Sequence, residues 1–174
     1  MGSPKAELVV DGTRLLDRSI GALAAGGCVP VIAVVRDGVL TPGAHRVVNP
    51  HPEDGLRSSL ALAVNAADEL EADGLVVVLV DMPGIGAEAV AALAAAWTPG
   101  RIAIGRYGMR SGHPIVMSVE LWQRAIKLAE PDEGARALLA ATPELVDEIA
   151  TVGNAFDIDS PADLREWISR NLRT

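Results

Sequence analysis

The sequence predicts an α/β fold of three layers, in which helices cover both faces of a mostly parallel sheet. The first observation is the unbroken apolar run from Leu75 to Val80, which is typical of a strand buried on both faces. The second is the alternation of strand and helix patterns along the chain, which is typical of βα units. The third is size. A chain of 174 residues, 49% of them hydrophobic, can form a single domain (residues 1–174) with a substantial core.

Turn and cap signals place the elements of the first half. The expected elements are an extended piece at residues 7–10, a helix at 13–25, a buried strand at 29–35, a short strand at 46–48 and an amphipathic helix at 58–70. Asp11-Gly12 closes the first piece, and Thr13 can cap the helix that follows it. Two glycines, Gly26 and Gly27, then end that helix.

The second half begins with the apolar strand that ends at Asp81, because Pro83 stops it. The expected elements after it are an alanine-rich helix at 87–97, strands at 101–105 and 114–118 around a loop at 106–113, helices at 121–128 and 134–141, a strand at 145–151 and a final helix. Ser160 and Pro161 start the final helix as its N-cap and its first helical residue.

Charge and cysteine content exclude several classes of function. The net charge is −8, which argues against non-specific binding to nucleic acid or to an anionic membrane. Cys28 is the only cysteine, so the chain has no internal disulfide and no cysteine zinc cluster, as expected in a reducing cytosol. No apolar stretch is long enough to span a bilayer, and a polar segment follows Met1 directly. We therefore expect a cytoplasmic protein.

Asp81 is the first candidate functional residue. It follows a predicted central strand, and open α/β sheets bind their ligands at the carboxyl ends of such strands. A carboxylate there is a natural ligand for Mg²⁺, which usually brings phosphates with it. The alternative is an aspartate that only caps the next helix.

The segment from Phe156 to Leu164 holds two more candidate carboxylates, Asp157 and Asp159. We expect their side chains to point to opposite faces of a short extended segment, so that only one of them faces a site beside Asp81. The alternative is that both are turn and cap residues of the final helix.

Two further segments suit contacts with a ligand. Gly108–Pro114 combines glycines with Arg110 and His113, which suits close approach to a phosphate or a flat ring. Asn49–Leu60 places small polar residues at the start of a helix, where free N–H groups can bind an anion or a base edge. The alternatives are a structural histidine and an ordinary serine N-cap. Lys5, read alone, is a solvated lysine of an N-terminal tail.

In this order, the segments resemble the MobA-like nucleotidyltransferases, and among them molybdenum cofactor cytidylyltransferase. The matching segments are Met1–Lys5, Asn49 with Gly55 and Ser58–Leu60, Asp81–Pro83, Gly112–Pro114, Asp132–Arg136 and Asp157–Leu164. Each is weak alone, but six in register cover essentially the whole chain. The resemblance implies a Rossmann-like, GT-A-like nucleotidyltransferase fold.

The resemblance also implies a reaction and its participants. CMP would pass from CTP to the terminal phosphate of a molybdopterin-type molybdenum cofactor, with Mg²⁺ or Mn²⁺ bound and pyrophosphate released. GTP is the alternative nucleotide, and a sugar phosphate or another phosphorylated metabolite is the alternative acceptor. A molybdoenzyme or its maturation chaperone is a possible partner, and neither nucleic acid nor membrane is expected.

Roles of individual residues follow from the same resemblance. Asp81 and Asp159 would hold the metal, with Asp157 as the fallback ligand, and Lys5 would act with Asp81 in catalysis by neutralising charge on the phosphates. The nucleotide side would consist of Gly2, Lys5, Asn49, Gly55, Ser58, Ser59 and Asp81. The acceptor side would consist of Arg110, Gly112, His113 and Asp132.

One departure from the family pattern concerns the N-terminus. The family's first strand and most of its glycine-rich, phosphate-binding loop would precede Met1. In one interpretation the native chain begins upstream, because loss of a central strand would expose the edges of its two neighbours. In the other the chain starts at Met1 and is a non-catalytic module that binds or delivers the cofactor.

Overall fold

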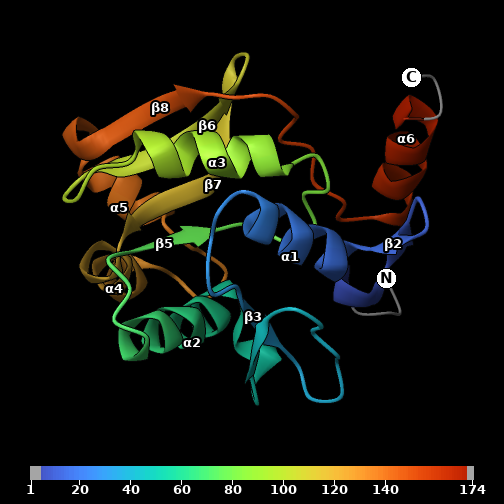
Figure 1. The fold of residues 1–174 in the computed structure, drawn as a ribbon, viewed down its shortest axis with the longest axis horizontal. Helices are drawn as coiled ribbons and strands as arrows, with labels where there is room; N and C mark the ends of the chain where they lie inside the picture. Colours follow the sequence, from blue (N-terminus) through green and yellow to red (C-terminus); the bar gives the residue numbers. More distant parts are fainter. Residues whose placement is uncertain (1–4, 172–174) are drawn as a thin grey trace.

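The computed structural model describes residues 5–171 (Figure 1). Its strands are β1 (Val9–Val10), β2 (Thr13–Arg14), β3 (Ile32–Val35), β4 (His45–Val48), β5 (Gly74–Val77), β6 (Ile102–Tyr107), β7 (Arg110–Ser118) and β8 (Val146–Ala150). Its α-helices are α1 (Leu15–Ala25), α2 (Leu56–Glu69), α3 (Ala87–Ala96), α4 (Val119–Leu128), α5 (Arg136–Ala141) and α6 (Pro161–Asn171). Short 3₁₀ turns are η1 (Lys5–Glu7), η2 (Pro52–Asp54) and η3 (Pro143–Leu145).

The largest sheet has the strand order β5-β7-β6-β8. β7 is antiparallel to both β5 and β6, whereas β6 is parallel to β8, so β5, β6 and β8 all run in one direction. β3 and β4 form a separate parallel pair. The expected predominance of parallel strands therefore holds, with β7 as the reversed strand.

Helices cover both faces of this sheet, as predicted. Side chains alternate along β6 and β7, because successive residues of a strand point to opposite faces. Ile104 and Ile115 pack with the buried residues of α2, α4 and α5. Ala103 and Val116 pack on the other face against Leu93 of α3. Figure 1 shows the resulting three layers, with α3 on one side of the sheet and α4 on the other.

Two local predictions were wrong because residues expected in a loop or a helix cap pair as β-strands instead. The expected loop at 106–113 is a hairpin, since Tyr107 pairs with Arg110 across a two-residue turn. Thr13 does not cap α1 but lies in β2, because Asp11 and Gly12 both have positive φ and form a tight turn between β1 and β2.

The strand before Asp81 is less buried than its apolar sequence predicts. β5 ends at Val77, and all four of its residues are only partly buried. In the register with β7, Val78 would face Pro114, which has no N–H to donate. A cavity of about 710 Å³ lies on the other side of β5, between it and β3. The expectation of a strand fully buried on both faces was therefore wrong.

No helix within residues 5–171 has both the length and the apolar character that crossing a bilayer requires.

The contact between α3 and the sheet should carry a large share of the stability. Leu93 is 0% exposed, so Leu93→Ala should lower the free energy of unfolding by about 2–5 kcal/mol. Leu128→Ala, at an α4 position that is 52% exposed, is the matched control and should change it by about 0.5 kcal/mol or less. Urea unfolding measures both, and equal losses would contradict this packing.

Candidate active site

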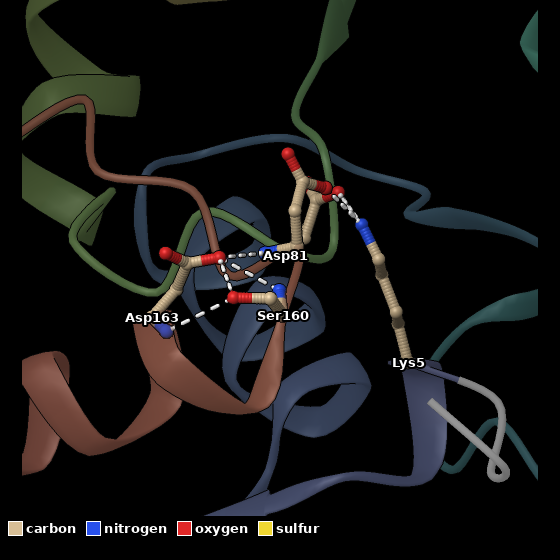
Figure 2. Close-up of polar contacts among 5 residues, drawn as sticks. Lys5, Asp81, Ser160 and Asp163 are labelled. Atoms are coloured by element: carbon tan, nitrogen blue, oxygen red, sulfur yellow. Dashed lines mark hydrogen bonds and ion pairs between the residues drawn. The ribbon is translucent and has the colours of Figure 1, made fainter.

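Three segments far apart in the sequence meet at one ammonium group. Lys5 Nζ donates a hydrogen bond to Asp81 Oδ2 at 2.8 Å, and it also donates to Asp159 Oδ1. Figure 2 shows Lys5 reaching from η1 to Asp81. Asp81 follows β5 in the sequence, and Asp159 precedes α6. The structure thus brings together three of the residues singled out in the sequence.

A backbone contact sets the distance between the two carboxylates. The N–H of Ile158 donates to the carbonyl of Asp81 at 2.8 Å. The Ile158 side chain is fully buried and packs with Val10, Leu15 and Trp167. An apolar anchor therefore fixes the residue next to Asp159 against the end of the β5 segment.

Asp163 holds the Asp159 backbone in place. Its Oδ2 accepts from the backbone N–H of Ser160 at 2.7 Å and from that of Asp159 at 3.2 Å. In return, Ser160 Oγ accepts from the Asp163 N–H at 3.3 Å, which is a reciprocal cap at the start of α6 (Figure 2). The side-chain hydrogen bond from Ser160 and the backbone hydrogen bonds lower the pKa of Asp163.

Asp163 was not among the predicted site residues, although the sequence carried its signal. A serine N-cap followed three residues later by a carboxylate is the pattern of a capping box. The predicted Ser160 cap is confirmed, and its consequence is that Asp159 is held rigidly beside Lys5.

The expected orientation of the paired carboxylates was wrong. Asp157 and Asp159 are both exposed, and Ile158 between them is buried. Residues two positions apart in an extended chain share a face, so the two carboxylates lie on the same side. Lys5 contacts Asp159. Lys5 thus forms ion pairs with Asp81 and with Asp159. These contacts favour Asp159 over Asp157 as the carboxylate that shares a site with Asp81.

Electrostatics favours a positive charge between these two carboxylates. Desolvation tends to lower the pKa of Lys5, but hydrogen bonds and charge attraction from Asp159 and Asp81 outweigh it and raise the pKa. The side chains of Asp81 and Asp159 are 20% and 64% exposed, so one carboxylate is sheltered and the other remains open to solvent. The Lys5 side chain is 34% exposed, so its ammonium can be reached from solvent.

Asn49 is the buried polar residue at the centre of the second candidate segment. It is 4% exposed, and its Nδ2 donates to the hydroxyls of Ser58 and Ser59 at 3.0 Å each. Its Oδ1 accepts from the backbone N–H of His51 at 2.9 Å. Asn49 thus ties the end of β4 to the first turn of α2 and orients both serines.

Gly55 and Asp132 lie against each other, although they were assigned to different ligands. A Cβ on Gly55, whose φ is +85°, would lie 2.5 Å from the Pro131 carbonyl oxygen and 2.6 Å from Asp132 Oδ1. Only glycine fits there. Asp132, predicted on the acceptor side, is therefore next to the start of α2, where residues predicted for the nucleotide side lie.

The remaining predicted residues lie on or beside β7. Arg110 is exposed at the end of the hairpin, and Gly112 pairs with Gly105 at an irregularity of the β6–β7 ladder. His113 is partly buried and close enough to Asp81 to sense its charge. Gly2 lies outside the described residues.

His113 is neutral at physiological pH. Desolvation lowers its pKa to about 4, although the negative charge of Asp81 opposes this shift. A neutral imidazole can still donate one N–H, but it adds no positive charge for an anionic ligand.

The comparison with known families can now be made. Residues 1–148 match the MobA-like NTP transferase domain. The chain belongs to this family. It is 31% identical, over 159 residues, to nicotine blue oxidoreductase of Paenarthrobacter nicotinovorans, in an alignment that covers 84% of this chain and 78% of that protein.

Solved structures support the same fold. A Mycobacterium sp. strain JC1 homologue of Mycobacterium tuberculosis Rv0371c has a TM-score of 0.83 at 26% identity, over 99% of this chain and 90% of that one. A nucleotidyl transferase from Methanothermobacter thermautotroptrophicus has a TM-score of 0.81 at 16% identity, over 97% of this chain and 85% of that one. The Rossmann-like nucleotidyltransferase fold predicted from the sequence is confirmed.

His113 should make stability depend on pH. Its pKa is lower in the folded protein than the ordinary value of 6.5, so its contribution is complete above pH 6.5 and is lost as the pH falls towards 4. Between pH 7 and 4.5, the wild type should lose about 2 kcal/mol more unfolding free energy than His113→Gln. His51→Gln, at an exposed position, is the control and should follow the wild type. Parallel curves for the wild type and His113→Gln would contradict the shift.

Proposed function

We propose that this protein is a metal-dependent cytidylyltransferase that transfers CMP from CTP to the terminal phosphate of a molybdopterin-type cofactor and releases pyrophosphate. The observation that carries the proposal is the convergence of Lys5, Asp81 and Asp159 at the end of the β5 segment. Membership of the MobA-like NTP transferase domain family supports nucleotidyl transfer. The choice of acceptor rests on the overall resemblance to molybdenum cofactor cytidylyltransferase, and the segments Ser58–Leu60 and Gly112–Pro114 favour the cytidylyl branch by the same resemblance.

The choice of cytidine has weaker support, from structural neighbours. A 2-C-methyl-D-erythritol 4-phosphate cytidylyltransferase from Thermus thermophilus has a TM-score of 0.68 at 20% identity, over 97% of this chain and 94% of that one. That likeness concerns the fold. GTP therefore remains the alternative nucleotide, and both must be tested.

The residues present fit a hard divalent cation. Two carboxylate oxygens, one from Asp81 and one from Asp159, already contact one positive charge. No cluster of three or more His, Cys, Asp or Glu suited to a metal occurs in residues 5–171. Two carboxylates with phosphates and water completing the shell is the usual arrangement for Mg²⁺. One neighbouring structure, of Mycobacterium tuberculosis Rv0371c at 23% identity, is a complex with manganese.

The chemistry needs positioning and charge neutralisation more than a protein base. An oxygen of the acceptor phosphate attacks the α-phosphorus, the bond to the β-phosphate oxygen breaks, and pyrophosphate leaves. The acceptor oxygen is already anionic, so no proton has to be removed. A divalent cation between Asp81 and Asp159 would supply charge neutralisation at the phosphates.

Individual side chains then have distinct tasks. Lys5, released from the carboxylates, offers three N–H donors to the α-phosphate or the departing pyrophosphate. Asn49 keeps the Ser58 and Ser59 hydroxyls in place at the nucleotide side. Neutral His113 can donate one hydrogen bond to the acceptor beside Asp81.

The direct test uses the native protein purified from its source. Thermal unfolding is followed with Mg²⁺ and either CTP or GTP, and pyrophosphate release is then measured with molybdopterin cofactor as acceptor. At a hundred times its dissociation constant, a ligand specific for the folded state adds roughly 2.7 kcal/mol, a shift of several degrees. A thermal shift and turnover with CTP support the proposal. Turnover with GTP alone means that GTP, and not CTP, is the nucleotide substrate. No turnover with either nucleotide rejects the proposal.

The name of one relative suggests a second candidate. Nicotine blue oxidoreductase is 31% identical to this chain, so a redox reaction on nicotine blue or a similar compound is the runner-up. Oxidation of NADH or NADPH with nicotine blue as the acceptor tests it. Dye reduction without pyrophosphate release would favour this second candidate.

Removing one carboxylate at a time should distinguish the two proposed metal ligands, Asp81 and Asp159, from the neighbouring Asp157. Asp81→Ala and Asp159→Ala should each lower the transfer rate by about 100-fold or more, because phosphate charge is no longer neutralised. Asp157→Ala is the matched control, since Asp157 is exposed on the same segment. Pyrophosphate release measures all three. Loss of activity in Asp157→Ala with retention in Asp159→Ala would reverse the assignment.

Replacement of Lys5 should strengthen metal binding while it weakens transfer. In the wild type a divalent cation has to displace the ammonium, whereas in Lys5→Met the two carboxylates lack that cation. The rise in melting temperature on adding Mn²⁺ should therefore be larger in Lys5→Met than in the wild type. Lys127→Met, on an exposed position of α4, is the control. An equal or smaller rise in Lys5→Met would show that Lys5 and the metal do not share a position.

A further inference from the structure

The two segments that carry the candidate metal ligands run alongside each other in opposite directions. At one end the N–H of Ile158 donates to the carbonyl of Asp81 at 2.8 Å. Further along, the N–H of Asn154 donates to the carbonyl of Gly84 at 3.3 Å. A single hydrogen bond would leave the second segment free to swing about it, whereas two hydrogen bonds also fix its direction. The contact at Asn154 therefore bears on where Asp159 is held.

These two hydrogen bonds enclose unequal lengths of chain. Residues 82–83 lie between them on the first segment, and residues 155–157 lie between them on the second. In a regular antiparallel pairing each residue has one partner, so Asp81 would lie opposite Asp157 rather than opposite Ile158. The second segment thus contains one extra residue, as a β-bulge does.

The extra residue decides which side chain of the second segment faces the core. Successive side chains of an extended segment point to opposite sides, so a shift by one residue exchanges the buried and the exposed positions. The observed pairing buries Ile158, which is 0% exposed, and leaves Asp157 and Asp159 at the surface. Without the extra residue, Asp157 would point to the core, where an unpaired charge is costly.

The side chain of Asn154 accommodates this extra residue. Its Oδ1 accepts a hydrogen bond from the backbone N–H of Phe156 at 3.1 Å. This is a turn in which a side-chain oxygen takes the place of a backbone carbonyl, and it folds the chain within the longer stretch. Because Asn154 is exposed, its side chain contributes through this turn rather than through packing in the core.

Two glycines allow the segments to approach this closely. A Cβ on Gly84 would lie 2.7 Å from the carbonyl oxygen of Asn154, which is closer than atoms can pack. Gly153 directs the chain into the contact with a φ of +100°, a backbone conformation that favours glycine. The approach at Asn154 is therefore built into the sequence of both segments.

We propose that Asn154 is a positioning residue of the candidate site. Its side-chain turn sets the register in which residues 154–159 lie against residues 81–84, and this register places Asp159 beside Asp81. The proposal rests on the proposed function only where it treats these two carboxylates as metal ligands. The register itself can be measured without metal or nucleotide.

Amide hydrogen exchange, followed by NMR, tests the register directly. In Asn154→Ala the N–H of Ile158 should exchange about 10-fold faster or more than in the wild type, because its hydrogen bond to the first segment opens more often. Asn154→Asp should restore slow exchange, since a carboxylate oxygen can also accept from the Phe156 N–H. The N–H of Ser160, which donates to Asp163, is the internal control and should not change. Unchanged exchange of Ile158 in Asn154→Ala, or equal acceleration at Ser160, would overturn the proposal.

A substitution on the opposite segment tests the same contact with a metal readout. The Cβ of Gly84→Ala should push the two segments apart, whereas Gly86→Ala is the matched control, with no atom within 4 Å of its Cβ. The rise in melting temperature on adding Mn²⁺ should fall to about half or less of the wild-type rise in Gly84→Ala and in Asn154→Ala, but not in Gly86→Ala. A wild-type rise in both variants would overturn the positioning role. No rise in the wild type itself would contradict the proposed metal site instead, and the exchange of the Ile158 N–H then decides the positioning role alone.

Discussion

The candidate site depends on one electrostatic constraint: the carboxylates of Asp81 and Asp159 share one site, and a cation between them offsets their mutual repulsion. Lys5 supplies that cation here, through hydrogen bonds to both. The same demand explains why the cluster suits a divalent metal, and why lysine and metal are alternatives at one position rather than independent ligands.

This constraint is useful only because the fold removes the freedom of the carboxylates to move apart. Asp159 is exposed and would be mobile on a free loop, but its neighbour Ile158 is buried and bonded to the Asp81 backbone. Asp163 then accepts from the Asp159 N–H through the cap of α6. Apolar packing and helix capping thus position a charged group that neither of them contacts directly.

Features carried by local sequence were predicted well, and those set by distant pairing were not. The Ser160 cap, the helix after Asp81 and the three layers follow from local signals and periodicity. The hairpin at Gly108 was mistaken for a loop because its strands are recognisable only from the pairing of β6 with β7. The contact of Gly55 with Asp132 joins segments far apart in the chain, and no local pattern reports it. The family resemblance identified Asp81, Asp159 and Lys5 as residues of one site. That Lys5 contacts both carboxylates became known only from the structure.

The half-buried state of β5 connects the sheet with the site. An apolar strand of this composition belongs in the middle of a sheet, yet here one edge borders a cavity. Asp81 follows the same run, so the precision with which its carboxylate is held depends on how firmly residues 75–80 are held. The packing of residues 75–80 and the position of the Asp81 carboxylate are therefore one structural requirement.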